Sequence, residues 1–420
     1  MATDSPRTGT TVDLEIGPVA HGGHCVARHE GRVVFVRHTL PGERVRARLT
    51  DAGQDAKFWR ADAVEILDAS PDRVPSAWPE AGPGGVGGGE LAHVALPAQR
   101  TWKQAVLAEQ LHRLARLDLA PEVAAAPGDD ERGGLAWRTR IDLHVDAEGR
   151  AGMRGYRSHD ILPLTGMPLA TEHIAALGLF DRRWPAGSRI EAIAPADGSS
   201  PIVLLDGAPF DLHSNRPDPR PNARAAVREH VEVGGTGYTY RVAAAGFWQV
   251  HREAPALLAA RVLDAVGDVA GATVLDLYAG AGLFTSPLAD AVGSDGRLVA
   301  VEGDARAIRD ARRNAHDRPQ VELHEGDVVD VLTGRRGGAP AVAAADVVVL
   351  DPPRTGAGRK VVDAVAALRP RRIVYVACDP AALARDIALL GERGWSDVTV
   401  TGHDLFPMTH HLEAVAVLDR

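Results

Sequence analysis

Apolar runs rich in β-branched residues alternate with helix-like segments throughout residues 234–420. Uninterrupted apolar runs separated by helices are typical of a parallel sheet covered on both faces. The short connection before the last run predicts an antiparallel hairpin at the end of the sheet. The pattern therefore predicts an α/β, Rossmann-like domain. Its predicted strands are Thr273–Leu277, Leu298–Val301, Val321–Leu323, Val347–Leu350, Arg372–Val376, Val398–Val400 and Ala414–Leu418.

The N-terminal half of the chain is predicted to be β-rich. Short alternating runs such as Arg32–Arg37 and Arg44–Leu49 are separated by tight turns, which predicts a small OB-like β-barrel over residues 8–68. A β-rich central domain is predicted over residues 69–233. Within it, apolar residues recur at helical spacing over residues 98–119, and we expect this helix to pack on the C-terminal domain.

Composition and charge limit the possible partners, cellular location and cysteine chemistry of the protein. The 420 residues carry a net charge of −9, a weak argument against a nucleic-acid partner because binding needs only a local basic surface. No apolar run could cross a bilayer, and the first residues lack a signal-peptide layout, so we expect a cytoplasmic protein without membrane contact. The two cysteines, Cys25 and Cys378, are too few for a disulfide framework, but one thiol can still be a nucleophile.

A glycine-containing turn follows the first predicted strand of the sheet. Gly280 and Gly282 let the backbone turn tightly at a helix N-terminus, where a ligand can approach closely. Thr285 stands where a dinucleotide fingerprint has its third glycine, which disfavours a nicotinamide cofactor. Acidic residues lie inside this strand and after the next two: Asp276, Glu302 and Asp327. We predict that they hold S-adenosylmethionine, against the alternative that they only cap helices.

The ends of the later strands carry groups suited to attack on a pyrimidine. The segment Asp351–Arg354 contains two prolines and predicts a rigid loop that can hold a flat base. Cys378 ends the fifth strand at the start of a helix, a position that predicts a lowered thiol pKa. Glu413 returns to the same edge just before the last strand.

These groups match the needs of methylation at carbon 5 of uracil. A thiolate that adds to carbon 6 creates an enolate, which can attack a sulfonium methyl group. A base must then remove the proton from carbon 5 so that the thiol can leave. Cys378 is the predicted nucleophile and Glu413 the predicted base. The target nucleotide must leave its stack to reach them.

Together these motifs resemble those of the RNA 5-methyluridine methyltransferases, specifically the bacterial 23S rRNA branch with an N-terminal TRAM domain. The matching segments are Gly17–His24, Phe247–Val250, Asp276–Gly280, Asp351–Gly356, Cys378–Pro380, Arg385-Asp386 and His411–Glu413. The resemblance implies a class I S-adenosylmethionine-dependent methyltransferase that acts on RNA, with 23S rRNA as the expected partner. A monomer is the default expectation. The implied cofactor contacts come from Gln249, Tyr278, Glu302, Asp327 and Asp351. The expected substrate contacts come from Pro352, Arg354, Arg385 and His411.

The chain departs from the family pattern at several positions. Many relatives bind an iron–sulfur cluster through four cysteines, whose matching positions here are Trp78, Val86, Gly89 and Met167. We therefore expect no cluster and no other metal. Further departures are His251 and Leu283, each in place of a common Asn, and Ala377, in place of Ser or Thr. None of these changes removes a predicted catalytic group.

Three alternatives stay open. Formation of 5-methylcytidine usually needs a second cysteine in a Pro-Cys motif, which the loop after Asp351 lacks. Transfer RNA is a less expected substrate, because the tRNA branch generally lacks a TRAM domain. A non-catalytic RNA-binding assembly factor is disfavoured by the intact Cys378 and Glu413.

Overall fold

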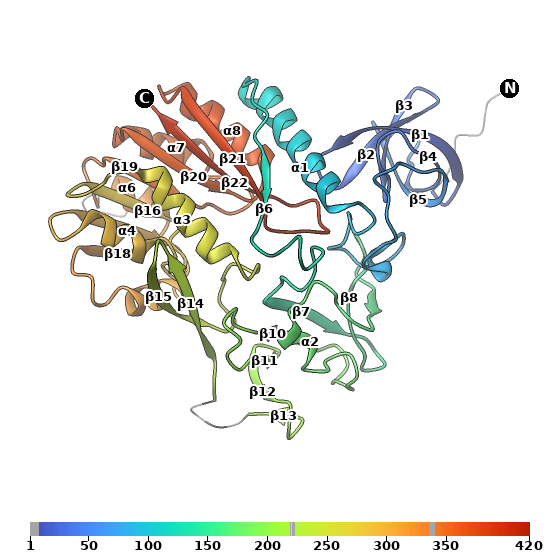
Figure 1. Cartoon of the computed structure of the whole chain (residues 1–420), viewed down its shortest axis with the longest axis horizontal. Coiled ribbons are helices and arrows are strands. Elements are labelled where there is room, and N and C mark those ends of the chain that lie inside the picture. The colour runs from blue at the N-terminus through green and yellow to red at the C-terminus, as the bar shows by residue number, and fades with distance from the viewer. Residues whose placement is uncertain (1–7, 219, 221–222, 336–340) are drawn as a thin grey trace.

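The N-terminal domain is a closed barrel. The computed structural model describes residues 8–218, 220, 223–335 and 341–420. The barrel strands follow the order β1-β2-β3-β5-β4, and pairing of β1 with β4 closes the ring (Figure 1). Apolar and polar residues alternate along the strands, so Val34, Val36 and Val45 are fully buried inside. The predicted barrel is confirmed. Its strands are β1 (Thr11–Ala20), β2 (His24–His29), β3 (Arg32–Arg37), β4 (Arg44–Asp51) and β5 (Trp59–Asp68).

The central domain is an antiparallel sheet in the order β13-β12-β11-β10-β7-β8-β9. Trp137 and Trp184 are among the large side chains buried in its core. Its elements are a short helix (Pro79–Ala81), β7 (Arg140–Val145), β8 (Ala151–Arg154), β9 (Ile161–Pro163), α2 (Glu172–Ala175), β10 (Arg189–Ile193), β11 (Ile202–Leu205), β12 (Ala208–Asp211) and β13 (Arg216–Pro217).

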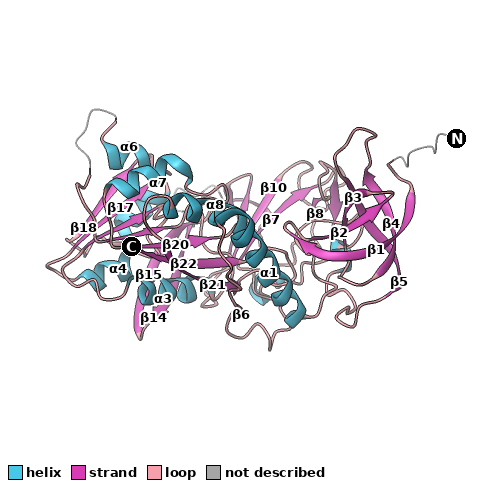
Figure 2. Cartoon of the chain, turned by 90° about the horizontal axis from the view of Figure 1, so that it is seen from above, coloured by secondary structure: helices cyan, strands magenta, loops and turns pink. Residues whose placement is uncertain are grey.

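The C-terminal domain is built on a twisted sheet in the order β18-β17-β16-β19-β20-β22-β21-β6 (Figures 1 and 2). Strands β16 to β20 run parallel, while β22 is antiparallel to β20 and β21, which confirms the predicted closing hairpin. Its strands are β16 (Thr273–Leu277), β17 (Arg297–Glu302), β18 (Val321–Glu325), β19 (Val347–Leu350), β20 (Arg372–Ala377), β21 (Asp397–Asp404) and β22 (Glu413–Asp419).

Helices cover both faces of this sheet. Val274 packs in one hydrophobic cluster with α3 and α4, while the next residue, Leu275, packs in another with α6, α7 and α8. Alternate residues of the buried strand thus meet opposite layers, which explains its continuous apolar sequence. The helices are α3 (Ala254–Val266), α4 (Thr285–Val292), α5 (Ala307–Asn314), α6 (Val328–Thr333), α7 (Gly358–Ala367) and α8 (Pro380–Gly391).

The segment after the barrel joins the domains. Helix α1 (Leu96–Gln110) continues into one π-helical turn (Leu111–Ala115), so the predicted helix over 98–119 is too long at its C-terminal end. Arg116, with φ +61°, ends it. The face with Trp102 and Val106 packs on the barrel, and Leu107 and Leu111 pack in the hydrophobic cluster on one face of the C-terminal sheet. Strand β6 (Val123–Ala125) then pairs with β21 at the edge of that sheet, an element not foreseen from the sequence.

The boundary expected between residues 233 and 234 falls inside a hairpin. Strand β14 (Ala226–Val233) pairs with β15 (Thr236–Ala243) across that turn. The inward face of the hairpin, including Val227 and Tyr240, is buried with α3 and α4 of the C-terminal domain. Alternation in the sequence indicates such strands but does not show which domain buries them. In the described part of the chain, no helix combines the length and apolar character needed to cross a membrane.

Candidate active site

The turn after β16 is strained and open. Tyr278, Gly280 and Gly282 have φ values of +66°, +58° and +93°. The N–H groups of Tyr278 and Ala279 both donate to the Val301 carbonyl, at 2.9 and 3.1 Å, which fixes this unusual path. A Cβ atom added at Gly280 would meet nothing within 4 Å. The backbone here therefore leaves room for a ligand to approach closely.

Buried carboxyl groups gather beside this turn. Asp276 accepts a hydrogen bond from Thr285 through Oδ2 at 2.6 Å, while its Oδ1 is buried without a partner among the described residues. Burial, together with the charge of Glu302, raises the pKa of Asp276 to about 7. Burial and then the charges of Asp276 and Glu302 raise the pKa of Asp351 to about 7. An unpartnered acid oxygen in such a cluster fits a cationic ligand with amino groups.

Two other predicted cofactor residues bond to the backbone. Glu302 accepts from the Gly280 N–H through Oε2 at 2.8 Å and from the Asp304 N–H through Oε1 at 2.6 Å. Asp327 caps α6, because its Oδ1 accepts from the N–H groups of Val329 and Asp330. The capping alternative therefore describes Asp327 as it stands, and its contact with the cofactor stays a prediction.

Gln249 lies in a buried segment anchored to the glycine turn. The ring of its neighbour Trp248 packs on Tyr240 with a centroid distance of 5.2 Å. The Tyr240 hydroxyl in turn donates to the Leu283 carbonyl at 2.9 Å. At Leu283, one of the departures from the family pattern, the backbone oxygen thus receives a hydrogen bond from the β14–β15 hairpin.

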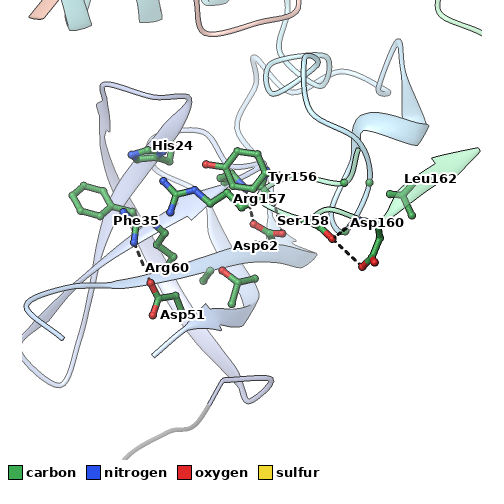
Figure 3. Close-up of a pocket in the computed structure, with 16 residues that line it drawn as sticks. His24, Phe35, Asp51, Arg60, Asp62, Tyr156, Arg157, Ser158, Asp160 and Leu162 are labelled. Carbon is green, nitrogen blue, oxygen red and sulfur yellow. Dashed lines mark hydrogen bonds and ion pairs between the residues drawn. The ribbon is translucent and has the colours of Figure 1, made fainter. Parts of the chain in front are cut away.

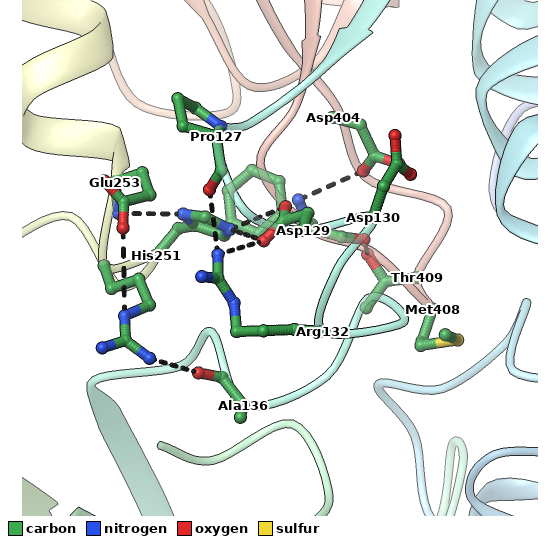
Figure 4. A network of polar contacts seen from close by, with 12 residues as sticks. Pro127, Asp129, Asp130, Arg132, Ala136, His251, Glu253, Asp404, Met408 and Thr409 are labelled. Atoms are coloured by element: carbon green, nitrogen blue, oxygen red, sulfur yellow. Dashed lines mark hydrogen bonds and ion pairs between the residues drawn. The ribbon is translucent and has the colours of Figure 1, made fainter. Parts of the chain in front are cut away.

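The departure at His251 has a clear structural account (Figure 4). Its Nδ1 accepts from the Glu253 N–H at 3.1 Å, so Nε2 carries the proton and donates to the buried Asp129 carboxylate at 3.0 Å. Asp129 is also paired with Arg132 at 2.8 Å. The histidine therefore ties the segment that carries Gln249 to the loop before β7.

Strand register brings Cys378 and Glu413 together. Strands β20 and β22 are antiparallel, and their last registered pair is Ala377 with Ala414. The next residues, Cys378 and Glu413, therefore lie at the same end of neighbouring strands. Asp351 follows the parallel strand β19 at this edge. Asp351 and Arg354 both lie close enough for their charges to act on the ionisation of Cys378 and of Glu413.

The prediction of a lowered thiol pKa is wrong for this structure. Burial, and then the charge of Glu413, raises the pKa of Cys378 to about 11, against an opposing effect of Arg354. The N-terminus of α8 does not stabilise the thiolate of Cys378, because Asp379 caps this helix by accepting a hydrogen bond from the Ala382 N–H at 2.8 Å. Burial and the nearby Asp351 also hold the pKa of Glu413 well above its ordinary value.

The Asp351–Gly356 loop is held by a residue to which the sequence motif assigned no role. Asp386 accepts from the Ala357 N–H at 2.7 Å, from the Tyr375 hydroxyl at 2.6 Å and from the Gly358 N–H at 3.1 Å. Gly356 has φ +84°, and a Cβ there would lie 2.6 Å from Asp386 Oδ2. The Arg-Asp pair in the sequence was the available signal, but only the structure shows what its aspartate does.

The residues expected to contact the substrate differ in their exposure to solvent and in their neighbours. Pro352 is buried, whereas Arg354 and Arg385 are exposed. The Arg354 guanidinium lies 3.5 Å from His411 Nε2. Burial and then the neighbouring His410 lower the pKa of His411 to about 3, so this ring is neutral at pH 7. Arg354 and His411 therefore border the Cys378 edge together, while Arg385 points to solvent from α8.

The barrel reaches this edge directly. His21 Nε2 lies 3.3 Å from the carboxylate of Asp379, the residue after the predicted nucleophile. A Cβ at Gly23 would lie 3.1 Å from His410, so the turn between β1 and β2 fits closely against the loop before β22. The barrel is thus part of the wall around the site.

The positions that match cluster cysteines form an apolar contact. Trp78, Val86 and Met167 are buried in one hydrophobic cluster. A Cβ at Gly89 would lie 3.0 Å from the Trp78 ring. These side chains offer no thiolate, so they do not fit an iron–sulfur cluster. Within the described residues, no group of three or more His, Cys, Asp or Glu could hold a metal ion.

The chain is similar to known RNA methyltransferases in both of its terminal domains. Residues 7–64 match the model of the TRAM domain, and residues 342–420 match that of the tRNA (Uracil-5-)-methyltransferase family. An uncharacterised RNA methyltransferase from Streptomyces coelicolor is 45% identical, over 98% of this chain and 93% of the relative. The 23S rRNA (uracil(1939)-C(5))-methyltransferase RlmD of Alkalilimnicola ehrlichii is 32% identical, over 97% of this chain and 96% of the relative.

A solved structure shares the whole fold. The tRNA (uracil-54, C5)-methyltransferase of Pyrococcus abyssi, in complex with S-adenosyl-L-homocysteine, superposes with a TM-score of 0.69 at 21% identity. The match covers 97% of this chain and all of that one. The barrel, the glycine turn and the edge that carries Cys378 agree with these matches, and the relatives establish the family of the protein. The chain belongs to the S-adenosylmethionine-dependent RNA uracil-C5 methyltransferases that carry an N-terminal TRAM domain.

Proposed function

We propose that this enzyme methylates carbon 5 of a uridine in 23S rRNA through a covalent bond between Cys378 and carbon 6 of the base. The observation that carries the proposal is the strand register that sets Cys378 beside Glu413 at the carboxyl edge of the sheet. The 23S rRNA substrate is supported by the similarity to RlmD of Alkalilimnicola ehrlichii over nearly the full length.

The cofactor supplies an electrophilic methyl group on a sulfonium. Its proposed site is the open glycine turn with Tyr278, Gly280 and Gly282. Asp276 and Asp351 are the proposed partners of the positive charge of the cofactor. Their pKa values are raised, and a bound cation would stabilise both carboxyl groups in the ionised form. The remaining proposed cofactor contacts are Gln249, Glu302 and Asp327. Asp327 would keep its backbone bonds through Oδ1 alone, whereas Glu302 holds its two backbone bonds through one oxygen each, Oε2 to Gly280 and Oε1 to Asp304.

The residues at the edge divide the chemistry between them. After its proton has passed to solvent, Sγ of Cys378 forms a bond to carbon 6 while the C5–C6 double bond opens toward the carbonyl at carbon 4, and the resulting enolate makes carbon 5 nucleophilic. After methylation, the Glu413 carboxylate takes the proton from carbon 5, and the electron pair of that C–H bond expels the thiolate. Since the pKa of Glu413 is raised well above its ordinary value, ionisation of this carboxyl must precede its role as a base.

Arg354 is suited to assist both groups. It opposes the rise in the pKa of Cys378 and of Glu413, so its guanidinium favours the ionised forms that the reaction needs. Pro352 is buried, so it would act by fixing the loop path. The exposed Arg354 and its neighbour His411 are the proposed contacts to the flipped base, and Arg385 is a proposed contact to the RNA backbone.

Two alternatives differ in substrate. Formation of 5-methylcytidine would need a second thiol near Cys378, but Cys25 is fully buried inside the barrel. Transfer RNA is a stronger alternative than the TRAM domain alone suggests, because the Pyrococcus abyssi tRNA enzyme is matched along its full length. A cytoplasmic monomer remains our proposal for the working form.

The test is to identify the methylated nucleoside and its RNA. Purified enzyme is incubated with S-adenosylmethionine and either 23S rRNA transcript or bulk tRNA transcript, followed by nucleoside mass spectrometry. We expect 5-methyluridine in the 23S rRNA sample. Methylation confined to tRNA would exclude the rRNA proposal, and 5-methylcytidine would exclude the uracil chemistry.

A further inference from the structure

A cavity between the barrel and the central domain lies outside the catalytic edge (Figure 3). Its volume is about 410 Å³, within the size range of small-ligand sites. His24, Phe35 and Arg60 line it from the barrel, while Tyr156 and Ser158 line it from the loop between β8 and β9. The β2–β3 face that contributes His24 and Phe35 is the surface on which OB-like barrels bind oligonucleotides.

Aromatic rings and arginine side chains lie next to one another on this surface. Phe35 packs edge-on against His24 at 5.0 Å and against Phe58 at 5.2 Å. Across the cavity, the Arg37 guanidinium lies over the Tyr156 ring, 3.4 Å from its centre, and covers that face of the ring, so the two side chains line the cavity as a stacked pair. Such rings are the platforms on which unpaired bases stack in single-stranded nucleic-acid sites. Burial and then His410 lower the pKa of His24 to about 4, so this ring is a neutral surface at pH 7.

The charges around the cavity favour a base over a phosphate. Its lining includes three arginines and three aspartates: Arg37, Arg60, Arg157, Asp51, Asp62 and Asp160. Arg37 is paired with Asp62 at 2.7 Å, and Arg60 with Asp51 at 3.1 Å. The charged lining therefore sums to zero, and its carboxylates would repel a phosphate group. A neutral heterocycle with both donors and acceptors suits it better.

The cavity is also close to the catalytic edge. His24 lines the cavity, and His21, three residues earlier, contacts Asp379 beside Cys378. Three residues of chain span at most about 11 Å. An RNA strand whose target base reaches Cys378 can therefore present a nearby nucleotide to the cavity.

We propose that this cavity holds one unpaired base of the RNA substrate, packed between Phe35 and the stacked pair of Arg37 and Tyr156, within a few nucleotides of the methylated uridine. The inference rests on the proposed function, because it takes RNA as the substrate that lies across both domains. The cavity then contributes affinity and position but no chemical step.

The test measures RNA binding and turnover separately. A fluorescein-labelled single-stranded RNA of random sequence is titrated with the full chain, saturated with S-adenosylhomocysteine, at one fixed salt concentration. We expect Phe35→Ala and Tyr156→Ala each to weaken binding about 5- to 150-fold, the range that stacking of one base supplies. Tyr156→Phe should bind as the wild type does, and melting temperatures verify that the variants are folded.

Matched controls separate this cavity from general electrostatics and from the catalytic site. Arg44→Ala removes an exposed barrel charge outside the cavity and should change affinity less than about threefold. Cys378→Ala should bind RNA normally while losing turnover. Normal binding by folded Tyr156→Ala, or no binding by the wild type, would overturn the cavity proposal. Weaker binding by Tyr156→Ala, in an enzyme that methylates no rRNA, would support the cavity and reject the rRNA substrate instead.

Discussion

Burial, and then the negative charge of Asp276, raises the pKa of Asp351 to about 7, and burial raises the pKa of Asp276 to about 7 as well. These two residues lie close together, since β16 and β19 are neighbouring parallel strands. Together with the unpartnered Asp276 Oδ1, they form an anionic end to the glycine turn. A cationic ligand placed there should draw protons off both groups.

Cofactor binding is therefore expected to release protons at pH 7. Groups with a pKa near 7 are about half protonated there, and a bound cation lowers their pKa, so about half a proton to one proton should leave. Calorimetric titration with S-adenosylmethionine in buffers of different ionisation enthalpy measures this number. Asp276→Asn should release fewer protons. Tight binding with a buffer-independent heat would contradict the assigned site.

The Cys378 thiol should react slowly with alkylating agents at neutral pH. Its pKa is raised to about 11, so the thiolate fraction increases about tenfold per pH unit below that value. Iodoacetamide labelling of the cofactor-free protein should accelerate across this range as long as the protein stays folded. Cys378→Ala leaves only the buried Cys25 and is the matched control. A plateau in labelling rate below pH 9 would show that the thiol is activated in the free enzyme.

A buried ion pair fixes the loop that leads to Glu413. Lys103 of α1 donates to Asp404 at 2.5 Å and to the Phe406 carbonyl at 3.0 Å, and both charged side chains are buried. Lys103→Met leaves Asp404 uncompensated and should lower the free energy of unfolding by ~3–5 kcal/mol. Lys103→Met combined with Asp404→Asn should recover part of this loss. Denaturant titration measures both, and a single-variant loss below ~1 kcal/mol would contradict the expected cost.

Asp386 and Tyr375 should affect turnover by positioning the Asp351 loop. Asp386→Asn places an amide donor where backbone N–H groups need an acceptor. This change should lower the free energy of unfolding by ~1–3 kcal/mol. Tyr375→Phe removes the hydroxyl that donates to Asp386 and accepts from the Ala357 N–H at 3.1 Å, and should cost ~0.5–1.5 kcal/mol for each of these two hydrogen bonds. We expect kcat to fall in both and the effects to be non-additive in the double variant. Asp363→Asn, at an exposed ion pair, is the matched control. Fully additive losses would show that the two residues act independently.

The sequence predicted much of this architecture because its signals are local. The apolar runs at Thr273–Leu277 and Val347–Leu350 coincide with β16 and β19. The glycine turn, Cys378 and Glu413 can be proposed as site residues from the sequence because strand ends and turn residues mark the edge of a parallel sheet. Strand β14 and the edge strand β6 lie in the segment predicted to be the central domain, since the catalytic-domain elements that bury them are distant in sequence.

Ionisation states were the least predictable property. A thiol before a helix suggests a lowered pKa, but Asp379 caps that helix and buried carboxyl groups surround the sulfur. These effects depend on side-chain positions in three dimensions. Similarly, no spacing rule indicates that Asp386 fastens the proline loop or that His21 of the barrel reaches Asp379.

The most direct test of the covalent mechanism uses 23S rRNA transcribed with 5-fluorouridine. Fluorine at carbon 5 cannot leave as a proton, so the adduct between Cys378 and carbon 6 should persist on a denaturing gel. We predict a slowly migrating protein–RNA band that requires S-adenosylmethionine and is absent in Cys378→Ala. Glu413→Gln should accumulate the same band with unsubstituted RNA. A methylating enzyme that forms no such band, or a band that survives in Cys378→Ala, would contradict the assignment of Cys378 as the nucleophile.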